Sequence, residues 1–392
     1  RYIETRQIEI YFEFSDMNKI EMVDLKSQYK AIENEVNEAI LNVVKNTAFI
    51  NGPDVKAFAA ELAQYLNVKH VIPCANGTDA LQIAMMALDL QPGDEVITPT
   101  FTYAATCEVI ALLKLTPVFV DCDPNTFNLD INKIEAAITP RTKAIVPVHL
   151  YGQCADMEPI LQIAAKHKLF VIEDTAQAIG AKYTFRNGSV ATAGTMGNVG
   201  ATSFFPSKNL GCYGDGGALF TNDDELALKM SQIANHGQTR LYYHDIVGVN
   251  SRLDTIQAAV LRVKLKHLDT YATARNHAAD FYDNAFKNHP KIKTPARAQN
   301  STHVFHQYTL TINIVDRDWF SAELDKAGVP NKVYYPIPQH LQKAYNLKNY
   351  REGDLPASES LSKKVISLPM HTELDNEQLQ YITQQVLTLL NS

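Results

Sequence analysis

The stretch SFFPSKNLGCYGDGG, residues 203–217, places one lysine after an aromatic strand end and before a run with four glycines in seven residues. Most lysines are solvated surface groups, but Lys208 follows Phe204-Phe205-Pro206, where a partly buried amine has its pKa drawn towards neutrality. Such an amine can attack a carbonyl and form a Schiff base. The glycines behind it allow a tight turn and a close approach to a bulky partner. Lys208 is therefore a candidate for covalent cofactor attachment, with a surface lysine as the alternative.

Short apolar segments alternate with helical patterns on the N-terminal side of this stretch. We expect strands at residues 70–74, 95–98, 117–121, 143–148 and 169–173, with two more at 201–205 and 218–221 around the lysine. Apolar residues at 32, 36, 40 and 43 predict an amphipathic helix, and Pro53 suits the first turn of a second one. Strands that alternate with helices are typical of an α/β fold with a mostly parallel sheet covered on both faces.

The C-terminal part has a different pattern. Apolar residues at 253, 256, 260 and 263 predict a long connecting helix. After Pro290 the pattern becomes α+β, with strands near 307–314 and 333–335 and a closing helix at 376–390. We therefore expect a large domain over 17–252 and a smaller α+β domain over 253–392. Residues 1–16 read unlike the rest, and we expect them to be a non-native or disordered extension.

Composition argues against several classes of protein. The 392 residues carry a net charge of −7 and no basic run, which argues against nucleic-acid binding. The odd number of cysteines, five, without a C-x-x-C pair argues against a disulfide framework or a zinc site and suits the cytoplasm. No apolar run reaches the length of a membrane span, and no metal site is expected.

Several polar groups follow the predicted strands, and ligands of an open parallel sheet bind outside the carboxyl ends of its strands. Asn76-Gly77-Thr78-Asp79 joins a strand to a helix, where backbone N–H groups and the Thr78 hydroxyl could hold a phosphate. An ordinary helix cap is the alternative. Asp174 could pair with a pyridinium nitrogen, or it could cap a helix. Tyr103 could stack on a flat ring, or it could belong to the core.

Phosphate cradle, ring platform, acid and lysine, in this chain order, are the parts that a pyridoxal phosphate enzyme needs. From about Val23 to its end, the chain resembles the DegT/StrS family of pyridoxal-phosphate-dependent nucleotide-sugar aminotransferases. That resemblance implies the aspartate aminotransferase fold, which is fold type I of these enzymes. The motifs that carry it are CANGTDAL at 74–81, EDTAQ at 173–177, SFFPSK at 203–208, NHG at 235–237 and GVNSRLD at 248–254.

The resemblance implies a role for each matching residue. Lys208 would form the Schiff base with pyridoxal 5'-phosphate and move a proton during transfer. Asp174 would pair with the ring nitrogen, and Gln177 would contact the ring hydroxyl. The other cofactor contacts would be Gly77, Thr78 and Ser203 at the phosphate, Tyr103 on the ring face, and Asn250.

The resemblance also implies a homodimer with shared active sites, because Asn250 and Arg252 match positions that reach the neighbouring subunit's site. Arg252 would supply charge for an anionic substrate, although a surface ion pair with Asp254 is the alternative. The further substrate contacts that we expect are Tyr334, Tyr335, His306 and Tyr308. Tyr334 stands where relatives carry histidine, which removes a titrating contact near the sugar.

Within the family, the runs around residues 75–81 and 205–217 look closest to aminotransferases of UDP-2-acetamido-2-deoxy-3-oxo-glucuronate in O-antigen biosynthesis. The expected reaction moves an amino group from L-glutamate to this UDP-linked keto sugar. A 4-keto-6-deoxy nucleotide sugar is the first alternative. A sugar dehydratase is disfavoured because those relatives carry histidine in place of Lys208. A non-catalytic regulator would lack site groups or add a DNA-binding module, and neither feature is found in the sequence.

Overall fold

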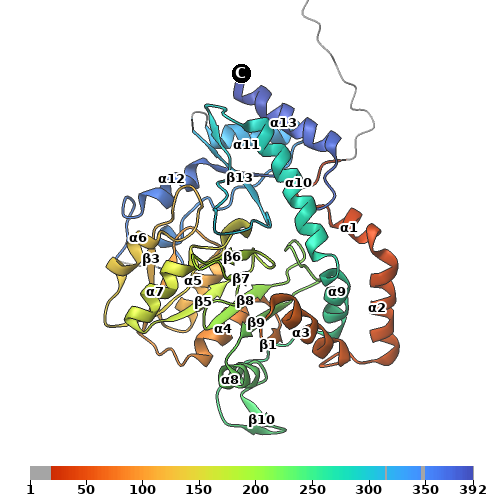
Figure 1. The fold of residues 1–392 in the computed structure, drawn as a ribbon, viewed down its shortest axis with the longest axis vertical. Helices are drawn as coiled ribbons and strands as arrows, with labels where there is room; N and C mark the ends of the chain where they lie inside the picture. Colours follow the sequence, from red (N-terminus) through yellow and green to blue (C-terminus); the bar gives the residue numbers. More distant parts are fainter. Residues whose placement is uncertain (1–18, 314–315, 346–348, 392) are drawn as a thin grey trace, which may run out of the picture.

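A seven-stranded sheet lies at the centre of the larger part of the molecule (Figure 1). The structure is a computed structural model that describes residues 19–313, 316–345 and 349–391, so the extension expected at 1–16 lies outside the described residues. The strands are β1 His70–Cys74, β2 Glu95–Pro99, β3 Thr116–Val120, β4 Thr142–Ile145, β5 Phe170–Asp174, β6 Lys182–Thr184, β7 Val190–Thr192, β8 Val199–Ser203, β9 Gly217–Thr221, β10 Gln238–Arg240, β11 Tyr243–His244, β12 Ile292–Lys293, β13 Tyr308–Ile312 and β14 Val365–Leu368. The helices are α1 Leu25–Ala31, α2 Glu33–Asn46, α3 Pro53–Leu66, α4 Gly77–Ala87, α5 Ala104–Leu112, α6 Ile131–Ile134, α7 Met157–His167, α8 Asp224–Ala234, α9 Thr255–Leu265, α10 Leu268–Phe286, α11 Arg317–Lys326, α12 Pro356–Lys364 and α13 Asn376–Asn391.

The strand order of the large sheet is β1-β9-β8-β5-β4-β2-β3. β9 runs antiparallel to both of its neighbours, β1 and β8. The pairs from β8 through β5, β4 and β2 to β3 are all parallel. The sheet is therefore mostly parallel, and the predicted α/β architecture is confirmed. The strand expected at residues 70–74 is β1, and the others in this sheet agree with their predicted positions within a few residues.

Apolar residues on alternate positions of these strands pack on opposite faces of the sheet. Val96 and Ile172 belong to one core, which α4 and α8 cover. Their chain neighbours Ile97 and Val171 belong to another core, together with α7. Phe220 of β9 packs with α3 and α9. Helices therefore bury both faces, so strands such as β2 and β9 are buried at every position.

A smaller antiparallel sheet, β12-β13-β14, lies at the top of Figure 1 with α10, α11 and α13. These helices pack on β13 and β14 through a separate apolar core that includes Tyr282, Phe320 and Leu379. The α+β pattern expected after Pro290 is confirmed. The domain boundary at residues 252 and 253 stays a prediction.

The helix predicted from the apolar residues 32, 36, 40 and 43 is α2, and Ile32, where φ is −120°, separates it from α1. One expected element differs in the structure. The strand expected at 333–335 is wrong, because this segment is irregular. Its β-forming residues are instead held by side chains of the large sheet's loops, since the Tyr151 hydroxyl donates to the Tyr334 carbonyl.

Three further observations concern membranes, metals and thiols. Within the described ranges, no helix has both the length and the apolar character needed to cross a membrane. The same residues contain no group of three or more His, Cys, Asp or Glu side chains that could hold a metal ion. All five cysteines are buried and free.

Because helices bury both faces of the large sheet, we expect buried residues of these helices to contribute strongly to the free energy of unfolding. Leu62 of α3 is fully buried, whereas Leu228 of α8 is 62% exposed. We expect Leu62→Ala to lower the free energy of unfolding by about 2–5 kcal/mol, because it leaves a cavity against α9. The matched change Leu228→Ala should cost about 0.5 kcal/mol or less. Denaturant unfolding of both variants measures the difference, and equal losses would contradict the packing described here.

Candidate active site

A cavity of about 850 Å³ lies at the carboxyl ends of the central strands. Its lining includes residues at or just after the ends of β1, β2, β5 and β8, together with two residues that precede β13 and the tyrosines of the 334–335 segment. All of the predicted site residues line it except Asn250, Arg252 and Tyr308. The predicted residues brought together are Gly77, Thr78, Tyr103, Asp174, Gln177, Ser203, Lys208, His306, Tyr334 and Tyr335.

Lys208 lies in the connection between β8 and β9, in a turn closed by its backbone N–H on the Phe205 carbonyl at 2.8 Å. Burial lowers the pKa of its amine from 10.5 to about 8, although the nearby Asp174 charge acts in the opposite direction. Among the described residues, the amine has no hydrogen-bond or ion-pair partner. A desolvated amine without a partner is a nucleophile at neutral pH.

Asp174 is the last residue of β5 and faces the same cavity. One carboxylate oxygen, Oδ2, accepts a hydrogen bond from the Thr106 hydroxyl at 2.7 Å. The other, Oδ1, accepts the Ala176 backbone N–H at 3.1 Å. The side chain is 7% exposed, so this carboxylate is held beside the cavity rather than in solvent.

The start of α4 forms the next wall. Asn76 caps this helix, because its side chain accepts the Asp79 N–H at 2.8 Å. The residue that caps the helix is therefore Asn76, and Thr78 lines the cavity. A Cβ on Gly77 would lie 2.6 Å from the Ser203 Cβ, so only glycine allows α4 and β8 to meet this closely. Exposed N–H groups at a helix start suit a phosphate.

Aromatic rings border the cavity beside these polar groups. Tyr103 precedes α5 and is 61% exposed, so it belongs to the rim and not to the core. Its ring centroid lies 6.3 Å from that of Tyr335. Gln177 accepts the Tyr151 N–H at 2.9 Å and donates to the Tyr335 hydroxyl at 3.0 Å. The Tyr335 phenol stays protonated because burial raises its pKa.

His306 comes from the segment before β13 and lies near Lys208. Burial, together with the charges of Lys208 and Arg275, holds the pKa of its imidazole well below 6.5. Its Nδ1 atom is buried and has no partner among the described residues. A neutral imidazole can donate or accept one hydrogen bond here, so His306 can meet a polar ligand without adding charge.

Three predicted residues do not line the cavity. Asn250 is exposed and pairs with Asn235 in an isolated bridge. Arg252 is half-buried, and the ion pair with Asp254 that was its alternative is not found in the described part of the chain. Tyr308 is fully buried in the small-sheet core, and its hydroxyl donates to Asp283 at 2.7 Å.

Sequence reasoning missed several lining residues, including Asp79, Thr102, Ser207, Asp215 and Gln307. Some of them lie inside the motifs already quoted, so their position next to predicted site residues was the one sequence feature that could have identified them. The lining now contains three carboxylates, and Lys208 is its single lysine or arginine among the described residues. An anionic ligand therefore meets little positive charge from one chain.

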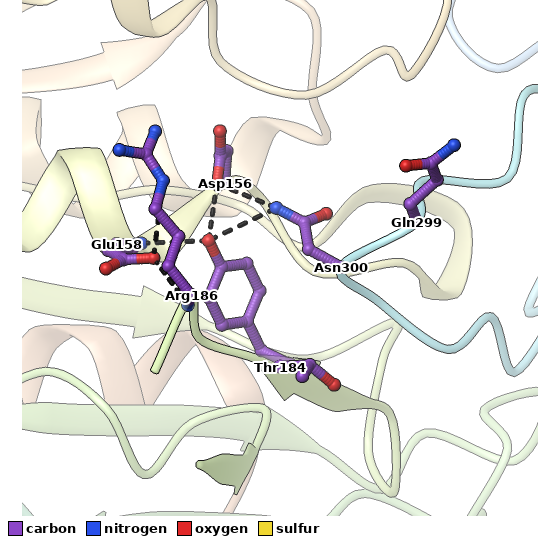
Figure 2. Close-up of a pocket in the computed structure, with 7 residues that line it drawn as sticks. Asp156, Glu158, Thr184, Arg186, Gln299 and Asn300 are labelled. Carbon is purple, nitrogen blue, oxygen red and sulfur yellow. Dashed lines mark hydrogen bonds and ion pairs between the residues drawn. The ribbon is translucent and has the colours of Figure 1, made fainter. Parts of the chain in front are cut away.

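A smaller hollow of about 240 Å³ provides a contrast (Figure 2). There the Tyr183 hydroxyl accepts the Glu158 N–H at 3.1 Å and donates to Asp156. Asn300 donates to the same Asp156 carboxylate at 2.9 Å, and the Arg186 guanidinium lies 3.8 Å from Glu158. These groups satisfy one another, and within the part of the chain that the structure describes none of the side chains around this hollow has a buried polar atom without a partner.

The lowered pKa of Lys208 predicts a pH dependence. At pH 7.5 a pKa of about 8 leaves about a quarter of the amine free, against about one part in a thousand at a pKa of 10.5. The rate of covalent attachment of pyridoxal phosphate to cofactor-free protein should therefore rise with a midpoint near pH 8. Borohydride trapping and mass spectrometry measure this rate, with Lys208→Ala as the control. A midpoint near 10.5 would contradict the buried position.

The cavity fits pyridoxal phosphate. The Lys208 amine, which has no partner among the described residues, can bind the aldehyde of the cofactor. The buried Asp174 carboxylate can pair with the ring nitrogen, and the start of α4 at Gly77 can hold the phosphate. When bound, this cofactor supplies an electron sink for the transfer of an amino group.

Known proteins resemble the whole chain. The chain is 49% identical to UDP-2-acetamido-2-deoxy-3-oxo-D-glucuronate aminotransferase of Pseudomonas aeruginosa, over 93% of this chain and 98% of the relative. It is 47% identical to a "Pleiotropic regulatory protein" of Geobacillus stearothermophilus, over 94% and 97%. Other relatives are named for other nucleotides. A dTDP-3-amino-3,4,6-trideoxy-alpha-D-glucose transaminase of Streptomyces venezuelae is 40% identical over 92% of this chain and 93% of the relative. GDP-perosamine synthase of Caulobacter vibrioides is 39% identical over 86% of this chain and 91% of the relative.

Solved structures agree with these relatives. A DegT DnrJ EryC1 StrS aminotransferase from Brucella abortus is 42% identical, with a TM-score of 0.90 over 95% of this chain and 100% of that chain. The structure of ntda from Bacillus subtilis, solved with the cofactor PMP, is 33% identical, with a TM-score of 0.86 over 95% and 83%. The DegT/DnrJ/EryC1/StrS aminotransferase family matches residues 30–387. The chain therefore belongs to this family and is a pyridoxal-phosphate-dependent nucleotide-sugar transaminase.

Proposed function

We propose that this transaminase moves an amino group from L-glutamate to a UDP-linked 3-keto sugar of the UDP-2-acetamido-2-deoxy-3-oxo-glucuronate type. The relative from Pseudomonas aeruginosa that carries this substrate in its name supports the choice of sugar. The product would enter the biosynthesis of a surface polysaccharide such as O-antigen. The same proposal places the enzyme in the cytoplasm, where five free thiols persist.

One observation carries the proposal: the Lys208 amine without a partner and the fixed Asp174 carboxylate share one cavity. In our assignment, Lys208 holds the cofactor and moves the proton that must leave one carbon and reach another. Asp174 keeps the ring nitrogen protonated. Its carboxylate would give a protonated ring nitrogen a negatively charged partner, and that pairing would favour the protonated form of the ring.

The remaining cofactor contacts follow from their positions around the cavity. Gly77, Thr78 and Ser203 meet at the start of α4 and are assigned to the phosphate. Tyr103 is assigned to the ring face. Gln177 is assigned to the ring hydroxyl, because its Oε1 is engaged by Tyr151 and its Nε2 retains a second proton beyond the one given to Tyr335.

The substrate side of the cavity is assigned to His306, Tyr334 and Tyr335. Burial raises the pKa of Tyr334, so its phenol is a neutral donor. The residue therefore recognises a sugar hydroxyl or carboxylate through a hydrogen bond rather than through charge. This is the chemical consequence of tyrosine in place of the histidine expected from the resemblance.

The charge of the cavity supports a homodimer with shared sites. Glutamate and a glucuronate both bring carboxylates, and the lining of one chain offers no arginine among the described residues. Arg252 of a second copy, with Asn250 beside it, would supply the missing positive charge. An arginine that reaches a carboxylate across an interface binds it through two parallel hydrogen bonds.

A second candidate substrate is a 4-keto-6-deoxy nucleotide sugar. Relatives named for dTDP- and GDP-linked sugars match almost the same length of chain and keep nucleotides other than UDP under consideration, although the dTDP relative is named for a 3-amino sugar. Fold and cofactor groups do not separate these substrates, since specificity depends on the residues that meet the sugar.

A single-turnover experiment tests the substrate. The enzyme is converted with glutamate, desalted, and mixed with UDP-2-acetamido-2-deoxy-3-oxo-glucuronate or with a dTDP-4-keto-6-deoxy sugar. We expect the visible absorbance of the lysine-bound cofactor to return only with the UDP sugar, and mass spectrometry to find the amino sugar. Lys208→Ala should show neither change. Return with the dTDP sugar alone would select the second candidate, and no response to glutamate would overturn the donor.

Mixed dimers test the shared site. Lys208→Ala and Arg252→Ala homodimers should each have little activity. When the two chains are mixed at equal amounts and reassociate, half of the dimers carry one intact site. About a quarter of wild-type activity should then return, because half of the dimers are mixed and each mixed dimer has one complete site out of its two. Activity that never exceeds the mean of the two homodimers would show that each site belongs to one chain.

A further inference from the structure

The backbone of Asp174 is fixed by the sheet. Its N–H donates to the Pro147 carbonyl at 2.9 Å, and its carbonyl accepts the His149 N–H at 2.9 Å. These bonds place the Cα and Cβ atoms but leave the side-chain torsions free. A carboxylate that must meet one ring atom needs a further constraint, because each rotamer directs its oxygens differently.

The carboxylate of Asp174 has two such constraints. The Ala176 N–H reaches Oδ1 at 3.1 Å from within the same turn. Thr106, which lies 68 residues away in the sequence, donates its hydroxyl to Oδ2 at 2.7 Å. In the described part of the chain, Thr106 is the one side chain that hydrogen-bonds this carboxylate. It is 1% exposed and does not line the cavity, so it acts from behind Asp174.

Thr106 is well suited to hold a fixed direction. It lies in α5, where a β-branched side chain has few χ1 choices. A helical threonine often donates to the carbonyl four residues earlier. Here that carbonyl, on Thr102, accepts the Gln339 side chain at 2.7 Å. The Thr106 hydroxyl donates to Asp174 instead.

We propose that Thr106 is a positioning residue: its hydroxyl holds one Asp174 oxygen so that the carboxylate stays directed at the ring nitrogen of pyridoxal phosphate. The inference rests on the role proposed for Asp174. Thr106 does not touch the cofactor, and it acts only through that carboxylate. α5 thus contributes twice, with Tyr103 at its start on the rim and Thr106 one turn later beneath the acid.

Binding of the cofactor tests this role without a catalytic assay. The measurements use a Lys208→Ala background, so that equilibrium dialysis of pyridoxal phosphate reports only non-covalent contacts. Thr106→Val keeps the shape and removes the hydroxyl, and it should weaken binding about tenfold, as expected for a lost bond to a charged group. Thr106→Ser keeps the hydroxyl and should bind within about threefold of the parent.

The deaza analogue of the cofactor, with CH in place of the ring nitrogen, separates positioning from packing. It has no ring nitrogen for Asp174, so Thr106→Val should bind it as tightly as the parent does. Equal weakening for both ligands would overturn the proposal, since it would show a packing role. Undiminished binding of pyridoxal phosphate by Thr106→Val would also overturn it.

Asp174→Asn in the same background separates this inference from its premise. If Asp174→Asn binds pyridoxal phosphate like the parent, the role proposed for Asp174 fails, and this inference fails with it. If Asp174→Asn binds weakly and Thr106→Val does not, only the positioning role fails. The combined variant should be no weaker than Asp174→Asn alone, because Thr106 acts through that residue.

Discussion

The buried carboxylate of Glu173 organises the carboxyl end of β5, on which the site depends. It accepts the backbone N–H groups of Gly194 at 2.8 Å and of Met196 and Gly197 at 2.6 Å. His149 donates to it at 2.8 Å, and the other ring nitrogen of His149 accepts the Ala155 N–H at 3.0 Å. A fully buried charge is costly unless it is hydrogen-bonded. These bonds offset that cost and tie β5 to two loops at once. Since neighbouring residues of a strand face opposite sides, anchoring Glu173 on one side directs Asp174 to the cavity on the other.

The reversed strand β9 explains how Lys208 meets Asp174. Because β9 is antiparallel to β8, the connection between them turns back at the sheet edge where β5 also ends. Gly217, which begins β9, approaches Asn76 so closely that a Cβ would lie 2.4 Å from its carbonyl carbon. The lysine, the acid and the start of α4 are therefore brought to one place by the topology of the sheet. Pyridoxal phosphate chemistry needs these groups together, and the fold supplies that arrangement.

Local signals in the sequence were sufficient for the large sheet and for the groups at its strand ends. Strands such as β1 were found because apolar runs and turn residues are encoded within a few positions. The segment at 333–335 was mispredicted because the β-propensity of Val333 and of the two tyrosines that follow competes with bonds from Tyr151, 183 residues earlier. Thr106 was not predicted as a site residue because its hydrogen-bond partner, Asp174, lies 68 residues away in the sequence. Tyr308 lies in the small-sheet core and not in the cavity lining, a direction that nothing in its local sequence marks.

The irregular segment with Tyr334 and Tyr335 differs from the cofactor side of the cavity in how it is held. Its contacts with the large sheet include the Tyr334 carbonyl and the Tyr335 hydroxyl, and nearby Gln339 donates its N–H to the Thr100 carbonyl at 2.8 Å. It adds no strand to either main sheet, so its side chains can change without breaking a ladder. Under the proposed function, the catalytic groups lie at the strand ends of the large sheet, whereas two of the substrate-facing groups, Tyr334 and Tyr335, lie on a separate loop. Substitutions in this short segment can therefore alter sugar recognition during evolution while the cofactor-binding residues stay unchanged.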